Sequence, residues 1–198
     1  MKYKLYGILS LCLAVTIVGT SIFLVKRDEG VFRYHQHLLA ETPTACNHTD
    51  DTFCTHLPLI EIFTPDGIEI PGKAIVDESG VTIGYEKTPD GKDELVAKVE
   101  VNSIDGVNHH AEDEPELKSD AIVHVRGNSS RTFDKLGYSI DLIKEDGTDN
   151  DVVFMGMDAH SEWALHGPFL DKTLIRTYMW YNIAGEIMEY SPNVRFCE

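Results

Sequence analysis

Apolar residues form three patterns along this 198-residue chain. An unbroken run from Tyr6 to Val25 contains 20 residues without a charge. Short segments that alternate apolar and polar residues fill the middle of the chain, and an apolar pattern of helical period follows near the end. In that order, the patterns predict a membrane-length helix, a set of strands and one main helix.

The first run is long enough to cross the hydrocarbon core of a bilayer as a helix. Two lysines precede it and a Lys-Arg pair follows it, so we expect residues 1–5 to be a short cytoplasmic N-terminus and residues 6–25 to be an uncleaved transmembrane anchor. A removable signal peptide is the alternative. The small residues Gly19-Thr20-Ser21 would then precede the cleavage site, but the apolar run continues past them to Val25.

Residues 26–55 are polar and lack periodicity, which indicates a stalk, and residues 56–198 form the predicted domain. Within the domain, alternation and β-branched residues predict strands at 57–63, 73–77, 81–86, 95–102, 121–125, 138–143 and 193–197. The strands at 121–125 and 138–143 are the clearest pair. Val123 and Val125 share one face of the first, and Tyr138, Ile140 and Leu142 share a face of the second.

A helix is predicted where apolar residues recur at steps of three and four, at Leu174, Ile175, Tyr178, Met179, Ile183, Ile187 and Met188. Asp171 can cap its start, and Pro192 ends any continuation. The fold class is therefore α+β, with mostly antiparallel strands and one main C-terminal helix, preceded by one transmembrane helix.

Charge excludes one class of partner. An apolar content of 42% is enough for a core, but residues 31–198 carry 13 basic and 31 acidic side chains, a net charge of −18. Such a chain is repelled by nucleic-acid phosphates, so nucleic-acid binding is excluded. Solubility explains most of the acidic excess, and binding of divalent cations at most a little.

Two cysteines flank a polar turn. Cys46 and Cys54 can close a small disulfide loop if the domain is exported. Zinc binding with His48 and His56 is the alternative, although the spacing matches no standard zinc motif. A further histidine pair lies in the acidic segment 109–116, which is typical of a solvated loop rather than a metal site.

The segment 126–131, Arg-Gly-Asn-Ser-Ser-Arg, can bind anions. Glycine lets the backbone approach a ligand closely, Asn and Ser are short donors, and the two arginines supply fixed positive charge. Lys135 can add a further charge. These properties suit phosphate oxygens, although many such loops between strands are only turns. The predicted nucleotide-binding residues here are Arg126, Gly127, Asn128, Ser129, Ser130, Arg131 and Lys135.

This segment and the two that follow it resemble the spore-coat CotH kinase family. Tyr138-Ser-Ile-Asp-Leu142 is similar to the family's next strand, and a block from Met155 through Trp163 to Arg176 is similar to the one after it. Of the family's basic pair, Lys135 matches the first member and Leu136 replaces the second. The resemblance implies the N-terminal half of an atypical protein-kinase-like fold.

The block from Met155 to Arg176 also contains candidate phosphate-binding residues. Lys172 and Arg176 are predicted to lie one turn apart at the start of the helix and to face a phosphate, or to pair with surface carboxylates. We expect them to converge with the 126–135 segment on one anionic site. Trp163 and Leu165 are predicted core residues, and Glu186 resembles the glutamate of protein kinases that anchors a lysine.

The resemblance implies phosphorylation of Ser or Thr on surface or spore-coat proteins, with ATP and Mg or Mn as cofactors. The family's catalytic aspartates come from a later part of its domain, with no counterpart before Glu198, so the chain alone is expected to be inactive. The predicted protein is the N-terminal portion of a membrane-anchored extracytoplasmic kinase at the cell surface. A non-catalytic adhesion or coat-assembly protein on the same scaffold is the alternative.

Overall fold

The computed structural model describes residues 13, 15–16, 33, 35–38, 46 and 52–198. The chain divides into two compact units, Met1–Arg33 and Tyr34–Glu198. In the first unit, residues 13, 15 and 16 are helical, and the rest of the predicted anchor lies outside the described residues. Among the residues that the structure describes, no helix has both the length and the apolar character needed to cross a membrane.

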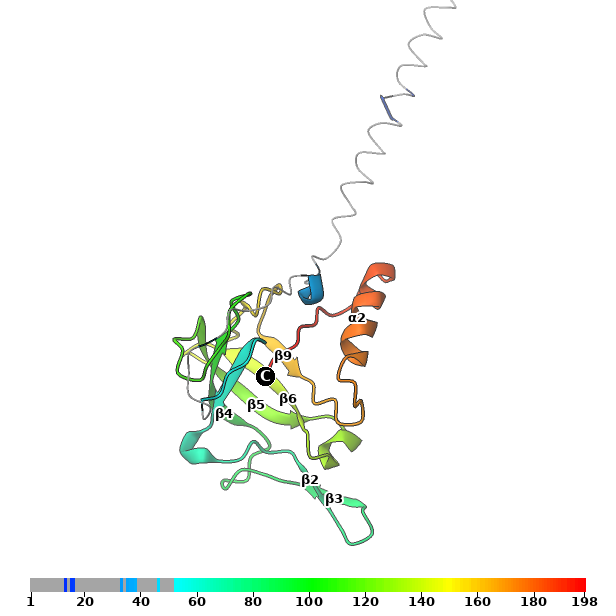
Figure 1. Cartoon of the computed structure of the whole chain (residues 1–198). Helices are drawn as coiled ribbons and strands as arrows, with labels where there is room; N and C mark the ends of the chain where they lie inside the picture. Colours follow the sequence, from blue (N-terminus) through cyan, green and yellow to red (C-terminus); the bar gives the residue numbers. More distant parts are fainter. Residues whose placement is uncertain (1–12, 14, 17–32, 34, 39–45, 47–51) are drawn as a thin grey trace, which may run out of the picture. The chain divides into compact units, whose positions relative to one another are not determined.

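The second unit is built around a five-stranded antiparallel sheet with the strand order β1-β4-β5-β6-β9 (Figure 1). Its strands are β1 (Leu59–Phe63), β4 (Leu95–Asn102), β5 (Leu117–Arg126), β6 (Gly137–Ile143) and β9 (Glu162–Leu165). The predicted strands at 57–63, 95–102, 121–125 and 138–143 are therefore confirmed, while β9 was not predicted because its four residues are too short for a periodic pattern.

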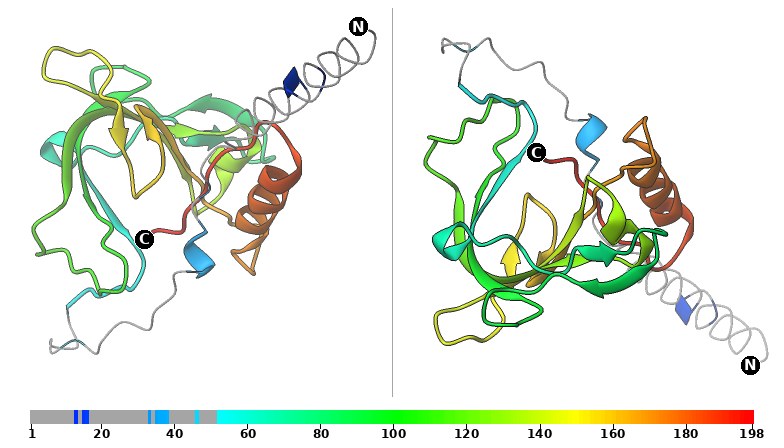
Figure 2. Two further views of the ribbon diagram at one scale, coloured as in Figure 1. Left: turned by 90° about the horizontal axis from the view of Figure 1, so that it is seen from above. Right: turned by 90° about the horizontal axis from the view of Figure 1, so that it is seen from below.

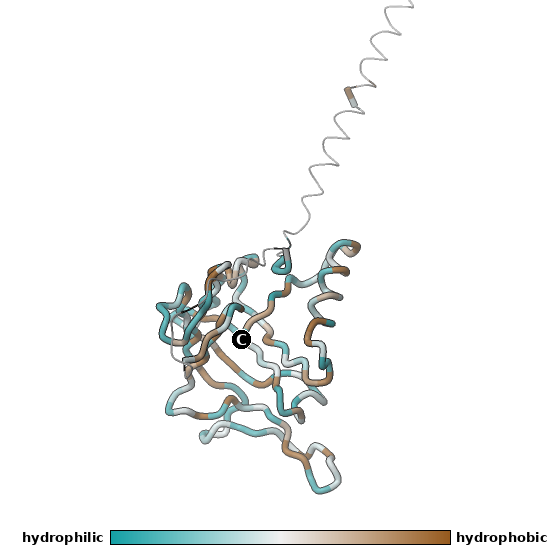
Figure 3. The backbone as a smooth tube through the Cα atoms, in the orientation of Figure 1, coloured by the Kyte–Doolittle hydropathy of each residue, from teal (hydrophilic) through white to brown (hydrophobic). Residues whose placement is uncertain are grey.

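The core lies on one face of this sheet. In the register of β5 and β6, Val123 lies opposite Ile140, and Ala121 lies opposite Leu142. Cross-strand partners point to the same face, so the predicted apolar faces of the two strands are one continuous surface. The residues buried on it are Ala97, Val99, Val101, Ala121, Val123, Ile140 and Leu142. Figure 3 shows hydrophobic stretches, in brown, along the strands of this sheet, interrupted by hydrophilic residues.

A segment between β6 and β9 covers that face. Phe154, Met155 and Met157 are buried against it, and Trp163 stacks on Phe154 with ring centroids 4.8 Å apart. Leu165 also packs on the core. The prediction that Trp163 and Leu165 are core residues is confirmed.

Short hairpins complete the sheet structure. β2 (Ala74–Val76) pairs with β3 (Thr82–Tyr85), which confirms the strands predicted at 73–77 and 81–86. β7 (Val152–Val153) pairs with β8 (Ala159–His160). Two single 3-10 turns, η2 (Pro65–Gly67) and η3 (Ser129–Thr132), lie in the connections.

The strand predicted at 193–197 is wrong. This segment is irregular, and only its end pairs with β1: Ile60 N donates to Glu198 O (3.0 Å), and Glu198 N donates to Pro58 O (2.9 Å). Figure 2 shows the segment running from α2 to β1 across the open side of the curved sheet. Burial raises the pKa of Cys197 to about 11.

The helix begins later than predicted. α2 spans Arg176–Ile187, because Leu174 has a positive φ of 61°, which interrupts helical geometry two residues earlier. No residue of α2 is buried, and Met179, Ile183 and Ile187 are exposed. The helical pattern correctly predicted a helix here. The apolar face that such a pattern leads one to expect in the core is not buried in the structure.

Part of the predicted stalk contacts the domain. The 3-10 turn η1 (Gln36–Leu38) faces α2 and the C-terminal segment: Gln36 bonds to both backbone groups of Phe196, and His37 Nδ1 lies 2.8 Å from the hydroxyl of Tyr178. His35 lies 3.4 Å from Glu186. Among the described residues Glu186 therefore faces a histidine, and its analogy with a lysine-anchoring glutamate stays a prediction.

Candidate functional site

The connection from β5 to β6 is the loop predicted to bind nucleotide, residues 126–135. Its first turn is closed by its own contacts. Gly127 has a φ of +111°, and a side chain there would collide with Ser130 Oγ, so the position requires glycine. Thr132 Oγ1 donates to Ser129 O (2.8 Å), and Phe133 N donates to Ser130 O (3.2 Å). The loop is thus a tight 3-10 turn rather than an open glycine-rich flap.

Arg131 holds this turn in place. Its Nε donates to Gly127 O (2.8 Å), and its NH1 donates to Gly72 O (3.4 Å) beside the β2–β3 hairpin. Its guanidinium also lies 4.7 Å from the centre of the Tyr85 ring, a cation–π distance. The positive charge of Arg131 is therefore already used to dock the loop on the hairpin.

Arg126 and Lys135 are available for a ligand. Both are exposed, and within the described part of the chain neither side chain has a hydrogen bond or an ion pair. Arg126 is the last residue of β5 and pairs with Gly137, the first residue of β6. Its stem lies over Gly137, which has no side chain to exclude it. The two cations mark the two ends of the loop.

The start of α2 is arranged around Asp171. This carboxylate is buried, and it accepts hydrogen bonds from Thr173 N (3.1 Å), Thr173 Oγ1 (2.7 Å) and Arg176 N (2.9 Å). The bonds from Thr173 and from the first amide of the helix hold the pKa of Asp171 below its ordinary value. Asp171 thus accepts a hydrogen bond from the first amide of α2, although the N-cap position itself is Ile175 and Asp171 lies five residues before the first helical residue.

Lys172 and Arg176 do not share a helix face. Lys172 precedes α2, so the prediction that the two lie one turn apart on the helix is wrong. Lys172 Nζ donates to Phe169 O (2.8 Å) and lies 4.4 Å from the centre of the Phe169 ring. Arg176 is exposed, and its NH2 lies 3.7 Å from Asp171 Oδ1. Both cations therefore have partners within the protein.

The loop and the helix start lie side by side. Phe133 of the loop stacks on Phe169, with ring centroids 5.1 Å apart, and Lys172 covers that ring. Gly167 packs directly on the backbone of Lys135 and Leu136, with no room for a side chain. Figure 1 shows the turn η3 next to the segment that leads into α2. Two phenylalanines, not adjacent cations, join the two segments, and the apolar pattern of the sequence did not reveal this contact.

A second polar cluster lies near the opposite end of β5. Cys46 and Cys54 are free thiols with Sγ atoms 3.9 Å apart, and His110 lies beside them. The predicted disulfide stays a prediction. Most of the segment 111–116 is exposed, as expected for a solvated loop, but His109 is only 3% exposed and His110 is half-buried. His56, by contrast, is exposed, and His48 lies outside the described residues.

Residues 123–198 match the family model described as CotH kinase protein. The matched segment begins in β5 and includes the loop, β6, β9 and α2, so it covers every residue predicted to bind nucleotide. The match confirms the resemblance over this part of the chain. No curated protein and no solved structure matches the chain.

Proposed function

We propose that this chain is part of a CotH-type kinase that transfers the γ-phosphoryl group of ATP to Ser or Thr residues of surface or spore-coat proteins. The observation that carries the proposal is the match of residues 123–198 to the CotH kinase model. The loop and the start of α2, which we assign to the nucleotide, both lie in that span.

The described residues fit the phosphates of a nucleotide. Arg126 and Lys135 are exposed cations at the two ends of the loop, and charge-assisted hydrogen bonds from such side chains to phosphate oxygens are strong. We assign Arg131 a different role, which is to hold the loop on the β2–β3 hairpin. Bound ATP would supply the phosphoryl group, and these side chains would bind and orient it.

The described residues at the proposed nucleotide site fit the divalent cation that the family implies less well than they fit phosphate. Asp171 is the carboxylate at the helix start, and its oxygens already accept hydrogen bonds from Thr173 and Arg176. We therefore assign no Mg or Mn ligand to it. In the proposed full domain, carboxylates outside the 126–176 region would hold the metal, as phosphoryl transfer requires.

The proposed location is the cell surface. In this proposal residues 6–25 anchor the protein in the membrane, and the acidic remainder faces outward, where its surface or coat protein substrates are found. Its net charge of −18 keeps the domain away from anionic lipid headgroups.

The test measures ATP affinity by calorimetry on the full chain. Arg126→Ala and Lys135→Ala should each weaken binding by about 1.5–3 kcal/mol, the usual contribution of a charge-assisted hydrogen bond, or roughly 10- to 150-fold. Neither should change the melting temperature, because both side chains are exposed. Lys144→Ala is the matched control, since this exposed lysine follows the other end of β6. Equal affinities in all four proteins would refute the assignment of the loop.

A second assay separates the kinase from the non-catalytic alternative. The full chain should bind ATP but should not transfer labelled phosphate to itself, because the resemblance places the catalytic aspartates beyond the matched segment. Label above that of a heat-treated control would show that the catalytic carboxylates lie within residues 1–198. Absence of any ATP binding would instead favour an adhesion or coat-assembly protein.

A further inference from the structure

The cluster of Cys46, Cys54 and His110 lies away from the proposed nucleotide site. His110 belongs to the connection between β4 and β5, whereas the loop at 126–135 follows the other end of β5. The ten residues of β5 separate the two regions by about 33 Å of extended strand. The cluster is therefore spatially separate from the proposed nucleotide site.

Backbone pairing places Cys54 and His110 next to each other. Thr55 and His109 form an isolated antiparallel bridge, with Thr55 N donating to His109 O (3.0 Å) and His109 N donating to Thr55 O (2.8 Å). In such a pair the next residues on either side, Cys54 and His110, lie opposite each other and point to the same face. Two residues 56 positions apart are thus fixed side by side by the backbone, not by flexible side chains.

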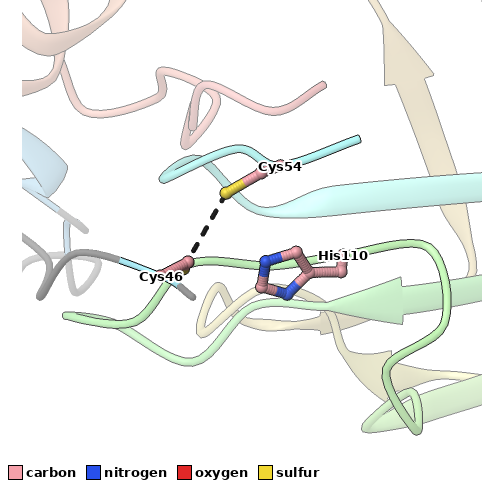
Figure 4. Close-up of side chains that lie close together, drawn as sticks. All are labelled: Cys46, Cys54 and His110. Carbon is pink, nitrogen blue, oxygen red and sulfur yellow. Dashed lines mark hydrogen bonds between the residues drawn. The ribbon is translucent and has the colours of Figure 1, made fainter. Parts of the chain in front are cut away.

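Asp113 orients the imidazole of His110. Its Oδ2 accepts a hydrogen bond from His110 N (2.8 Å) and lies 3.2 Å from His110 Nδ1. A carboxylate on one ring nitrogen fixes the tautomer and leaves the other nitrogen as the basic one, the arrangement found behind metal-binding histidines. Figure 4 shows the ring of His110 with a nitrogen directed toward the two cysteines.

The distances suit a tetrahedral metal ion. Zinc–sulfur bonds of about 2.3 Å at tetrahedral angles place two thiolate sulfurs roughly 3.8 Å apart, whereas a disulfide needs about 2.0 Å. The observed separation of Cys46 Sγ and Cys54 Sγ is 3.9 Å, and the ligand atoms of all three residues lie within 4.8 Å of one another. Asn108 Nδ2 donates to Cys46 Sγ (2.8 Å), a bond that stabilises a thiolate.

We propose that Cys46, Cys54 and His110 bind one Zn²⁺ ion, with Asp113 as the positioning residue behind His110 and water in the fourth position. Two thiolates and an imidazole bind zinc in preference to magnesium or calcium, which favour oxygen ligands. Both thiols lose their protons as the two Zn–S bonds form, so binding releases two protons. The ion would fasten the segment that carries Cys46 to the connection between β4 and β5.

The experiment uses the reduced full chain and Co²⁺ as a spectroscopic probe, followed by displacement with Zn²⁺. We expect one ion per chain and a thiolate-to-cobalt charge-transfer band that zinc abolishes. Cys54→Ser and His110→Ala should each weaken binding at least tenfold. Asp113→Asn keeps all three ligands and should weaken it about 10- to 100-fold, as loss of the carboxylate behind a ligating histidine does. His56→Ala, which removes an exposed histidine, is the control and should bind like the wild type.

Three results would overturn the proposal. The first is absence of the charge-transfer band in the reduced wild type. The second is an affinity that His110→Ala leaves unchanged. The third is a Cys46–Cys54 disulfide that forms in the folded protein even with excess Zn²⁺ present, because an occupied site would protect both thiols. Thiol titration after denaturation detects it, and circular dichroism verifies that each variant is folded.

Discussion

The contact between Gly167 and the loop is the most direct test of how the proposed site is assembled. A methyl group on Gly167 would lie 2.8 Å from Lys135 O and closer still to the carbonyl oxygen of Leu136. Both neighbours are backbone atoms, which cannot rotate away as a side chain can. Gly167→Ala should therefore push the segment before α2 off the end of the loop.

The magnitude follows from two losses. Forcing a methyl group into a well-packed place costs about 1–3 kcal/mol. Separation of the segments also weakens the stack of Phe133 on Phe169, and such aromatic pairs contribute about 0.5–1.5 kcal/mol. We expect the free energy of unfolding to fall by about 2–4 kcal/mol, which is a fall in melting temperature of about 5–15 °C for a chain of this size.

Chemical and thermal denaturation measure this change, and Gly84→Ala is the matched control. Gly84 lies in β3, and the nearest atom to a methyl group there is Ile75 Cδ1 at 4.0 Å, so this change should stay within about 0.5 kcal/mol. If Gly167→Ala is as stable as Gly84→Ala, the two segments are not in contact. The reasoning that joins the loop to the start of α2 would then be refuted.

Three further predictions concern the helix cap, the loop and the N-terminal run. The pKa of Asp171 is lowered by its hydrogen bonds, so the stability that it contributes is present above the ordinary carboxyl pKa and is lost as pH falls through the lower pKa of the folded protein. The difference in melting temperature between the wild type and Asp171→Asn should thus be largest near neutral pH and disappear in strong acid; a constant difference would contradict the capping role. Arg131→Ala should lower the free energy of unfolding by about 1–2 kcal/mol through loss of its bonds to Gly127 and Gly72, measured by urea denaturation. If Arg131→Ala is as stable as the wild type, Arg131 does not hold the loop in place and its charge is available for a ligand. The expressed protein should sediment with membranes and resist carbonate extraction if residues 6–25 are an anchor, whereas a soluble product that starts near Ser21 would show a cleaved signal.

The candidate site could be predicted only in part. The Arg-Gly-Asn-Ser-Ser-Arg segment indicated a loop between two strands, and the structure has that loop between β5 and β6. Its residue types did not reveal which cations have partners. Arg131 and Lys172 donate to backbone carbonyls, while Arg126 and Lys135 are exposed without side-chain partners among the described residues. Residue type gives the charge, but only packing decides what the charge faces.

The neighbours of the two cysteines could not be predicted from the sequence either, because one of them is far away along the chain. Cys46 and Cys54 are close to His48 and His56 along the chain, so their spacing indicated those two histidines as neighbours. The structure instead brings in His110, through the pairing of Thr55 with His109. A backbone bridge between distant segments has no local signal, so the spacing of the cysteines could not identify their third neighbour.

The sequence by itself determined the strands at the centre of the sheet, the existence of the C-terminal helix and the acidic charge of the domain. These features follow from alternation, helical period and charge, which are local properties of the chain. Tertiary structure decided the start of α2, where Leu174 adopts a positive φ, and the irregular path of residues 193–197. It also decided which side chains meet at the loop and at the cysteine cluster. Those features depend on contacts between segments that are far apart in sequence. Such contacts form, and contribute to stability, only when the chain folds.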